Sequence, residues 1–144
     1  NETAEQHNAR EAAAQYLSFQ AFSRKGLIGQ LKFDGFPAAV ATYAVDHVNV
    51  NWADQATKAA TTYVENMPLS QPRLVDQLVF DGFTREQAQN GVRSLDDVDW
   101  NAEAVEAARS YLETQHFSRD GLIGQLVFDG FTQAQANYAA DQTF

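Results

Sequence analysis

The side chains that most often carry enzyme chemistry are few in this sequence, and they are not grouped. The three histidines are His7, His47 and His116, and none has a serine and a carboxylate at a spacing that would suggest a catalytic triad. Because the chain has no cysteine, thiol nucleophiles, disulfides and cysteine-rich zinc sites are excluded. We therefore expect no catalytic, cofactor-binding or metal-binding residues, and we interpret the protein as a non-enzyme that needs no cofactor.

One acidic segment has part of the pattern of a calcium-binding loop. Asp96-Asp97-Val98-Asp99 carries the closely spaced carboxylates with which such a loop begins. The glycine that the loop requires is missing, and the closing position holds Ala108 instead of glutamate. The simpler interpretation is an acidic linker in which Asp99 caps the helix that follows.

The overall charge argues against two classes of partner. Ten basic residues against nineteen acidic ones give a net charge of -9, whereas a protein that binds nucleic acid needs Lys and Arg to displace counterions from phosphates. The same deficit disfavours an anionic membrane surface, and no apolar run approaches the roughly 20 residues that span a bilayer. A basic partner would be attracted to this chain.

The dominant feature of the sequence is an internal repeat. Phe-Asp-Gly-Phe occurs at 33–36, 80–83 and 128–131, with spacings of 47 and 48 residues. Residues 16–36 and 111–131 are identical at 16 of 21 positions, and the middle copy, 63–83, matches the third at 11 of 21. We therefore predict three copies of one unit, at residues 1–50, 51–98 and 99–144.

Each unit is predicted to contain three short helices, so the fold class is all-α: three tandem three-helix repeats of about 47–48 residues with helix-turn-helix-like units. Apolar residues in the first part of the third copy fall on one helical face, and the other copies repeat the pattern. That face consists of Trp100, Ala104, Ala107, Ala108, Tyr111 and Leu112. Residues 47–51 and 94–99 are short linkers between the units.

Local signals set the ends of the predicted helices. The second helix of each unit begins at a serine, which is a good N-cap, and it ends at Asp-Gly, where glycine supplies a left-handed C-cap. The third helices begin with capping boxes in the second and third units. The serines are Ser23, Ser70 and Ser118, and the capping boxes are 84–87 and 132–135.

Two tryptophans are predicted to join the units. A unit of this size is too small for a stable core of its own, so we expect the three to pack on one another through buried Trp52 and Trp100. The equivalent position in the first unit is Glu5, which suits a terminal repeat whose outer side no neighbour covers.

The helix-turn-helix-like arrangement does not predict DNA binding. In a DNA-binding protein of this type, the second helix of the motif carries basic and amide groups into the major groove. The corresponding segments 37–46 and 132–141 contain no Lys or Arg, and only the middle copy has Arg85 and Arg93, near acidic residues. Plain helix packing, with no nucleic-acid partner, is the better interpretation.

The repeated motif resembles the Ltp family of host cell surface-exposed lipoproteins. The resemblance rests on Phe-Ser-Arg-Xaa-Gly-Leu-Ile-Gly-Gln-Leu-Xaa-Phe-Asp-Gly-Phe at 22–36 and 117–131, on Tyr-Ala-Val-Asp at 43–46, and on the tryptophan that opens the next copy. It implies an extracellular protein held at the cell membrane of a Gram-positive bacterium by a lipid anchor whose cysteine lies outside this chain. Prophage-borne members act in superinfection exclusion, blocking DNA injection by an incoming phage. Bacterial chromosomes also carry such repeats outside any prophage.

The resemblance and the charge together favour a binding protein. The first hypothesis is a phage-exclusion protein that binds a phage protein, with a basic segment of that protein as its candidate contact. The alternative is a surface module that binds a wall polymer or a host protein. We expect the partner-binding residues at the junction of the second and third copies: Asp96, Asp97, Asp99, Glu103 and Glu106. Glu103 and Glu106 are expected to point into solvent, because they share a helix face and Trp100 is taken to turn the opposite way.

Overall fold

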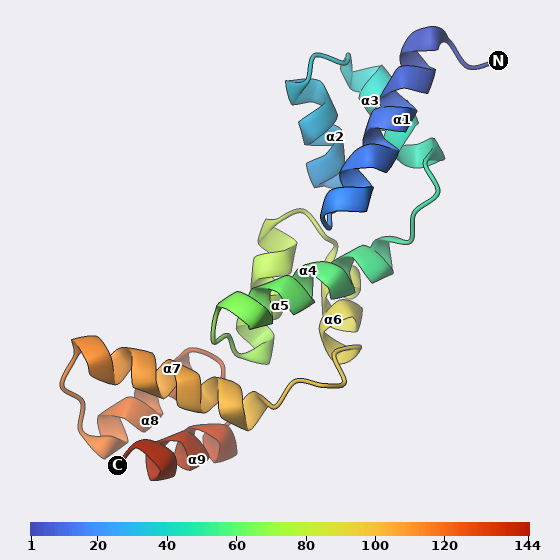
Figure 1. Cartoon of the computed structure of the whole chain (residues 1–144). Helices are drawn as coiled ribbons and strands as arrows, with labels where there is room; N and C mark the ends of the chain where they lie inside the picture. Colours follow the sequence, from blue (N-terminus) through green and yellow to red (C-terminus); the bar gives the residue numbers. More distant parts are fainter.

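The computed structural model describes residues 1–144, and it consists of nine α-helices with no strand (Figure 1). The all-helical, three-repeat fold predicted from the sequence is confirmed. The helices are α1 (Ala4–Phe19), α2 (Arg24–Phe33), α3 (Ala38–His47), α4 (Trp52–Asn66), α5 (Gln71–Phe80), α6 (Arg85–Arg93), α7 (Trp100–Thr114), α8 (Arg119–Phe128) and α9 (Gln133–Thr143).

The helices form three units, α1–α3, α4–α6 and α7–α9, which follow one another along an elongated array with the two termini at opposite ends (Figure 1). In each unit the first helix packs mainly against the third, and the second helix packs against both. Each unit closes its own hydrophobic core. The molecule is therefore a row of small cores joined end to end.

Two leucines on the second helix form the centre of each core. Their side chains are completely buried and pack against buried alanines of the first and third helices. Alanine leaves room for the first and third helices to approach closely, and it favours helix at the same time. The leucine pairs are Leu27 and Leu31, Leu74 and Leu78, and Leu122 and Leu126.

The helix ends form as the sequence predicts. The three serines cap α2, α5 and α8, and capping boxes open α6 and α9. At the end of α2 the N–H of Gly35 donates to the carbonyl of Lys32 and the N–H of Phe36 to that of Leu31. This Schellman turn requires a left-handed residue, and Gly35 has a φ of 105°.

A hydrogen-bonded triad explains why tyrosine and aspartate recur in every unit. In the first unit the Tyr16 hydroxyl donates to the carboxylate of Asp34 at 2.5 Å, and the Gln30 amide donates to both groups at 3.3 and 3.2 Å. The same triads are Tyr63–Gln77–Asp81 and Tyr111–Gln125–Asp129. Each triad ties the first helix to the turn that ends the second, so it fixes the shape of the unit.

The middle unit lacks an ion pair that the outer units share. Arg24 donates to both carboxylate oxygens of Asp46 at 2.8 and 2.9 Å, and Arg119 pairs with Asp141 in the third unit. In the middle unit both positions differ: the arginine is replaced by Gln71, and the aspartate of Tyr-Ala-Val-Asp by an arginine. The two changes in the middle copy therefore belong to one lost contact.

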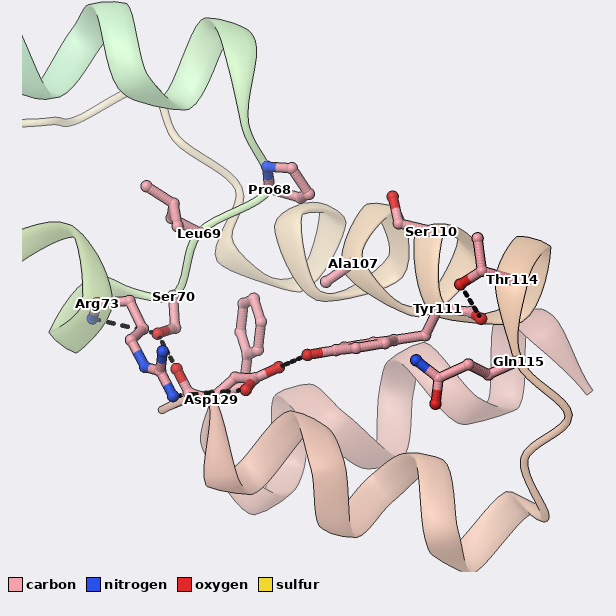
Figure 2. A pocket seen from close by; sticks show the side chains of 11 residues that line it. Pro68, Leu69, Ser70, Arg73, Ala107, Ser110, Tyr111, Thr114, Gln115 and Asp129 are labelled. Atoms are coloured by element: carbon pink, nitrogen blue, oxygen red, sulfur yellow. Dashed lines mark hydrogen bonds and ion pairs between the residues drawn. The ribbon is translucent and has the colours of Figure 1, made fainter. Parts of the chain in front are cut away.

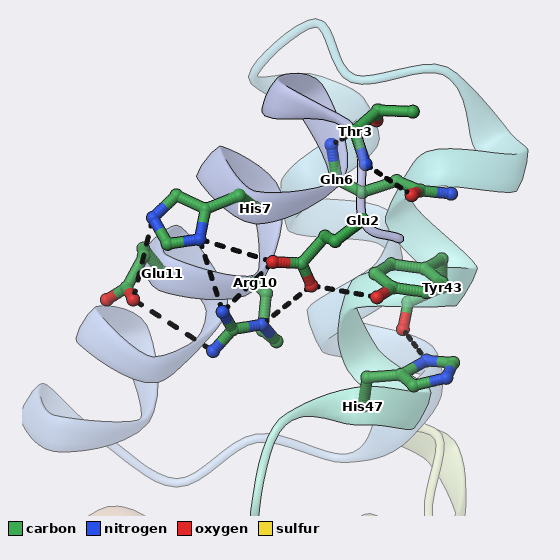
Figure 3. A network of polar contacts seen from close by, with 8 residues as sticks. All are labelled: Glu2, Thr3, Gln6, His7, Arg10, Glu11, Tyr43 and His47. Carbon is green, nitrogen blue, oxygen red and sulfur yellow. Dashed lines mark hydrogen bonds and ion pairs between the residues drawn. The ribbon is translucent and has the colours of Figure 1, made fainter.

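A polar network unique to the first unit surrounds Glu2 (Figure 3). Arg10 donates to its two carboxylate oxygens at 2.9 and 3.1 Å, and the Tyr43 hydroxyl donates at 2.8 Å. These hydrogen bonds, that from Arg10 first, lower the pKa of Glu2 from 4.5 to about 2. The network ties the segment before α1 to α3 on the outer side of the array.

The two tryptophans contact the preceding unit, but they are not fully buried as predicted. Trp52 packs against the core of the first unit and Trp100 against that of the second, and both side chains are half-buried. Each unit makes most of its contacts internally. The junctions are therefore small: the tryptophans lie at them as predicted, but they are half-buried where burial was expected.

Candidate partner-binding surface

The linker before α7 carries the first part of the predicted acidic site. Asp96 and Asp97 are exposed and make no hydrogen bond or ion pair with another side chain. Asp99 caps α7, because its carboxylate accepts a hydrogen bond from the N–H of Ala102 at 3.1 Å. Two of the three carboxylates in this linker are thus available to a partner, and the third is engaged at a helix end.

Glu103 does not point into solvent, which corrects the sequence prediction. It lies at the junction with the middle unit, and its Oε1 is buried without a hydrogen-bond partner. Burial raises the pKa of Glu103, the backbone N–H of Leu69 lowers it, and Glu106 and Asp99 raise it further. That N–H already donates to the carbonyl of Met67 at 3.1 Å, so it satisfies the carboxylate poorly.

Glu106 remains on the surface. It is exposed and forms a loose pair with Arg109 one turn later, at 3.6 Å. A hollow beside it is also lined by Glu103 and by Glu65 from the end of α4. Sequence reasoning missed Glu65, because only the fold brings the end of one unit's first helix beside the next unit. Asp96 and Asp97 do not line this hollow.

A larger groove runs between the second and third units, with a volume of about 410 Å³ (Figure 2). At its floor the Ser70 hydroxyl donates to the carbonyl of Asp129 at 2.6 Å, and the guanidinium of Arg73 lies 3.5 Å from the carboxylate. Its remaining walls come from Pro68, Leu69, Ala107, Ser110, Tyr111, Thr114, Gln115 and Phe131. More of the groove's lining is apolar than polar, and its charged groups are already paired with each other.

Three phenylalanines form the most unusual feature of the surface. Phe33, Phe80 and Phe128, the first phenylalanine of each Phe-Asp-Gly-Phe, are 86, 85 and 74% exposed. The second phenylalanine of the motif is buried in the middle and last units, as Phe83 and Phe131. We refer to the three exposed side chains as the phenylalanine ladder. The three side chains lie outside the hydrophobic cores, so core packing does not explain why they recur in all three units. The recurrence is visible in the sequence, but sequence reasoning did not identify it as functional.

The structure shows neither a metal-binding group nor a spanning helix. No three His, Cys, Asp or Glu side chains come together in a way that could hold a metal ion. None of the nine helices has the length and apolar character needed to cross a bilayer.

Comparison with known proteins identifies the family. The family model described as host cell surface-exposed lipoprotein matches three times, at residues 4–48, 51–95 and 99–142. The chain belongs to this family. Each match covers one three-helix unit, so the family resemblance stated from the repeated motif is confirmed, and the lipoproteins of this family are proteins of the cell surface.

One solved structure carries the comparison further. The chain is similar to the structure of Ltp, a superinfection exclusion protein from the Streptococcus thermophilus temperate phage TP-J34, with 33% sequence identity and a TM-score of 0.59. The match covers 65% of this chain and 97% of the phage protein. No curated protein sequence matches this chain. The lipoprotein described here thus extends beyond the length that the phage protein occupies.

Proposed function

We propose that this lipoprotein acts in superinfection exclusion: it binds a protein of an incoming phage at the cell surface and blocks injection of the phage DNA. The observation that carries the proposal is the similarity to the phage TP-J34 protein, which extends over 97% of that chain at 33% identity. The two structures share a TM-score of 0.59, and membership of a surface-lipoprotein family agrees with an encounter outside the membrane.

Binding, without catalysis, accounts for the features of the surface. The ladder offers three apolar contacts of the same kind, one on each unit, and exposed aromatic side chains are typical anchors of protein interfaces. The net charge of -9 favours a basic segment of the phage protein, which Asp96, Asp97 and Glu106 would attract. Under this proposal aromatic anchors supply affinity, and the acidic groups speed and orient the encounter.

The test is phage challenge of cells that display the lipoprotein through its lipid anchor. Phage adsorption should be unchanged, while release of phage DNA into the cytoplasm should fall. Equal DNA release with and without the lipoprotein would refute phage exclusion. Binding to purified wall polymer or to a host protein in the absence of any effect on phage would favour the alternative of a surface interaction module.

Variants of the phenylalanine ladder test, in the same phage assay, whether these side chains form the contact surface. Replacing Phe33, Phe80 and Phe128 together by serine should abolish exclusion and leave the helical circular dichroism spectrum unchanged, because the three side chains lie outside the cores. Phe19→Ser is the matched control, since Phe19 is 78% exposed but does not recur in the other units. If the triple variant excludes phage as well as the parent, the ladder is not the contact surface.

A further inference from the structure

At both junctions between units, a serine hydroxyl donates a hydrogen bond to the next unit. The Ser23 hydroxyl donates to the carbonyl of Asp81 at 2.8 Å, and the Ser70 hydroxyl donates to that of Asp129 at 2.6 Å. Each hydroxyl also accepts a hydrogen bond from the helix that it caps. The two serines are only 3 and 2% exposed. A helix cap of one unit is therefore the contact to the next.

The partner of each serine is an Asp-Gly turn that leaves no room for a side chain. A Cβ atom on Gly82 would lie 2.6 Å from the Ser23 Oγ, and one on Gly130 would lie 2.6 Å from the Ser70 Oγ. The backbone of the turn sits directly on the serine at both junctions. Besides supplying a left-handed C-cap, glycine at this position allows the units to join.

A second hydrogen bond completes the first junction. The N–H of Phe22 donates to Oε1 of Gln55 at 3.0 Å. We use the term donor edge for the residue pair that contributes this N–H and the serine, 22–23 in the first unit. The acceptor edge consists of two parts of the next unit. One is its Asp-Gly turn, here 81–82, and the other is the side-chain oxygen that accepts the hydrogen bond, here that of Gln55.

Two edges of the array are not covered by any of the three units described here. The donor edge of the third unit is Phe117 and Ser118; Ser118 is exposed, and its hydroxyl accepts from Gly121 but donates to no group of the chain. The acceptor edge of the first unit is Asn8 with the turn 34–35, all of it exposed. Nothing lies within 4 Å of a Cβ built on Gly35.

We infer that these two edges bind each other between molecules, so that the third unit of one copy joins the first unit of a second copy head to tail. The inference does not depend on phage exclusion. Its basis is that both edges repeat the sequence of edges that bind each other within the chain. Residues 117–126 differ from 22–31 only by Asp120 in place of Lys25. The Asp-Gly turn of the acceptor edge is identical in all units. Asn8 supplies an amide oxygen where the next unit has Gln55.

Charge favours this contact over the pairing of two third units. The first unit, residues 1–50, contains four basic and five acidic groups, a net of -1, whereas the third unit, residues 99–144, contains two basic and seven acidic groups, a net of -5. The Cβ of Lys25 lies 3.1 Å from a Cβ built on Gly82, so Asp120, at the equivalent position, would border the turn that contains Asp34 in the second copy. The nearly neutral first unit repels a third unit far less than another third unit would.

The contact is weak, and it does not close on itself. Glu5 occupies the position where the inner units have a tryptophan, and no linker holds the partners together, so we expect a dissociation constant on the order of 1 mM. Because the two edges are different surfaces, a bound pair still has one free edge at each end and can add further copies. Such chains would form where anchoring concentrates the lipoprotein on a surface.

Nuclear magnetic resonance of the ¹⁵N-labelled chain tests the contact. Raising its concentration from about 0.05 to about 2 mM should shift the amide signals of both edges, 117–119 and 34–36, and no others to the same extent. Ser118→Asp should weaken association roughly tenfold, since aspartate still caps the helix but has no proton to donate to the carbonyl. Thr132→Asp is the matched control: Thr132 also caps a helix of the third unit, away from the donor edge, and its replacement should change nothing.

A mixing experiment tests the direction of the contact. In labelled Ser118→Asp with excess unlabelled parent, the amides of 34–36 should shift, because the acceptor edge is intact, and those of 117–119 should not. Any of three results would overturn the inference: no concentration-dependent shifts up to about 2 mM, shifts centred away from the two edges, or equal shifts in the parent and Ser118→Asp.

Discussion

Glu103 offers the sharpest test of how the junctions are built. Its carboxylate occupies the position of Gln55, which accepts the hydrogen bond from Phe22 at the first junction. At the second junction Leu69 directs its N–H to Met67, and Oε1 of Glu103 stays buried without a partner. The second junction therefore contains the charged carboxylate of Glu103 at the position where the first junction has the neutral amide of Gln55.

Glu103→Gln should stabilise the protein at neutral pH. A buried acceptor without a partner costs about 1–3 kcal/mol, and because part of this side chain is still solvated, we take the lower end and expect a gain of about 1 kcal/mol at pH 7. Urea denaturation followed by far-ultraviolet circular dichroism measures the gain. Glu106→Gln is the control, because it removes the same charge from an exposed position of the same helix.

The pH dependence of the gain follows from the direction of the pKa shift. Burial raises the pKa of Glu103 above its ordinary value of 4.5, so the folded chain takes up a proton before the unfolded chain does. The parent is therefore relieved of the charge as pH falls toward 4.5, and the advantage of Glu103→Gln should shrink over the same range. An equal gain from Glu106→Gln, or a gain that persists unchanged in acid, would refute the burial argument.

Three further predictions follow from the same structure. Trp100→Ala should lower the free energy of unfolding by about 1–3 kcal/mol in a urea titration, less than for a fully buried aromatic, because the ring is half-exposed. Glu2, with its pKa lowered to about 2, contributes stability that is present above its ordinary value of 4.5 and is lost as pH falls toward 2; Glu2→Gln should flatten this loss in an acid titration. Neutralising Asp96, Asp97 and Glu106 to the amides should weaken binding of a basic partner and reduce its salt dependence, measured by calorimetry at two salt concentrations.

Helix ends were predictable because their chemistry is local. A serine cap, a capping box and an Asp-Gly stop each depend on groups within a few residues of one another, so the sequence displays them completely. The repeat then gave each signal three times. Helical spacing is also a local pattern, and it assigned Ala104, Ala107 and Ala108 to a buried face correctly.

Surfaces between units could not be predicted in this way. Glu103 lies one turn after Trp100, so the two share a face of α7, and the prediction that Trp100 turns away from Glu103 is wrong on helix geometry alone. The preceding unit covers that side of α7, where Trp100 packs. Exposure within Phe-Asp-Gly-Phe was hidden because the glycine reverses the chain direction between Phe80 and Phe83 and leaves only the second in the core.

The structural roles of the residues that recur in the repeat support a binding role. Tyrosine, glutamine and aspartate hold each unit in shape, the leucines fill its core, and serine with glycine joins it to the next. These tasks account for almost the whole shared motif, and the exposed phenylalanine is the member that they leave unexplained. An apolar side chain that lies outside the cores and recurs once per unit along the array presents several copies of one contact, although Arg73 lies over the ring of Phe128. Linked contacts that are individually weak bind tightly only to a partner that can engage more than one of them, which is how a short repeat gains selectivity for an extended target.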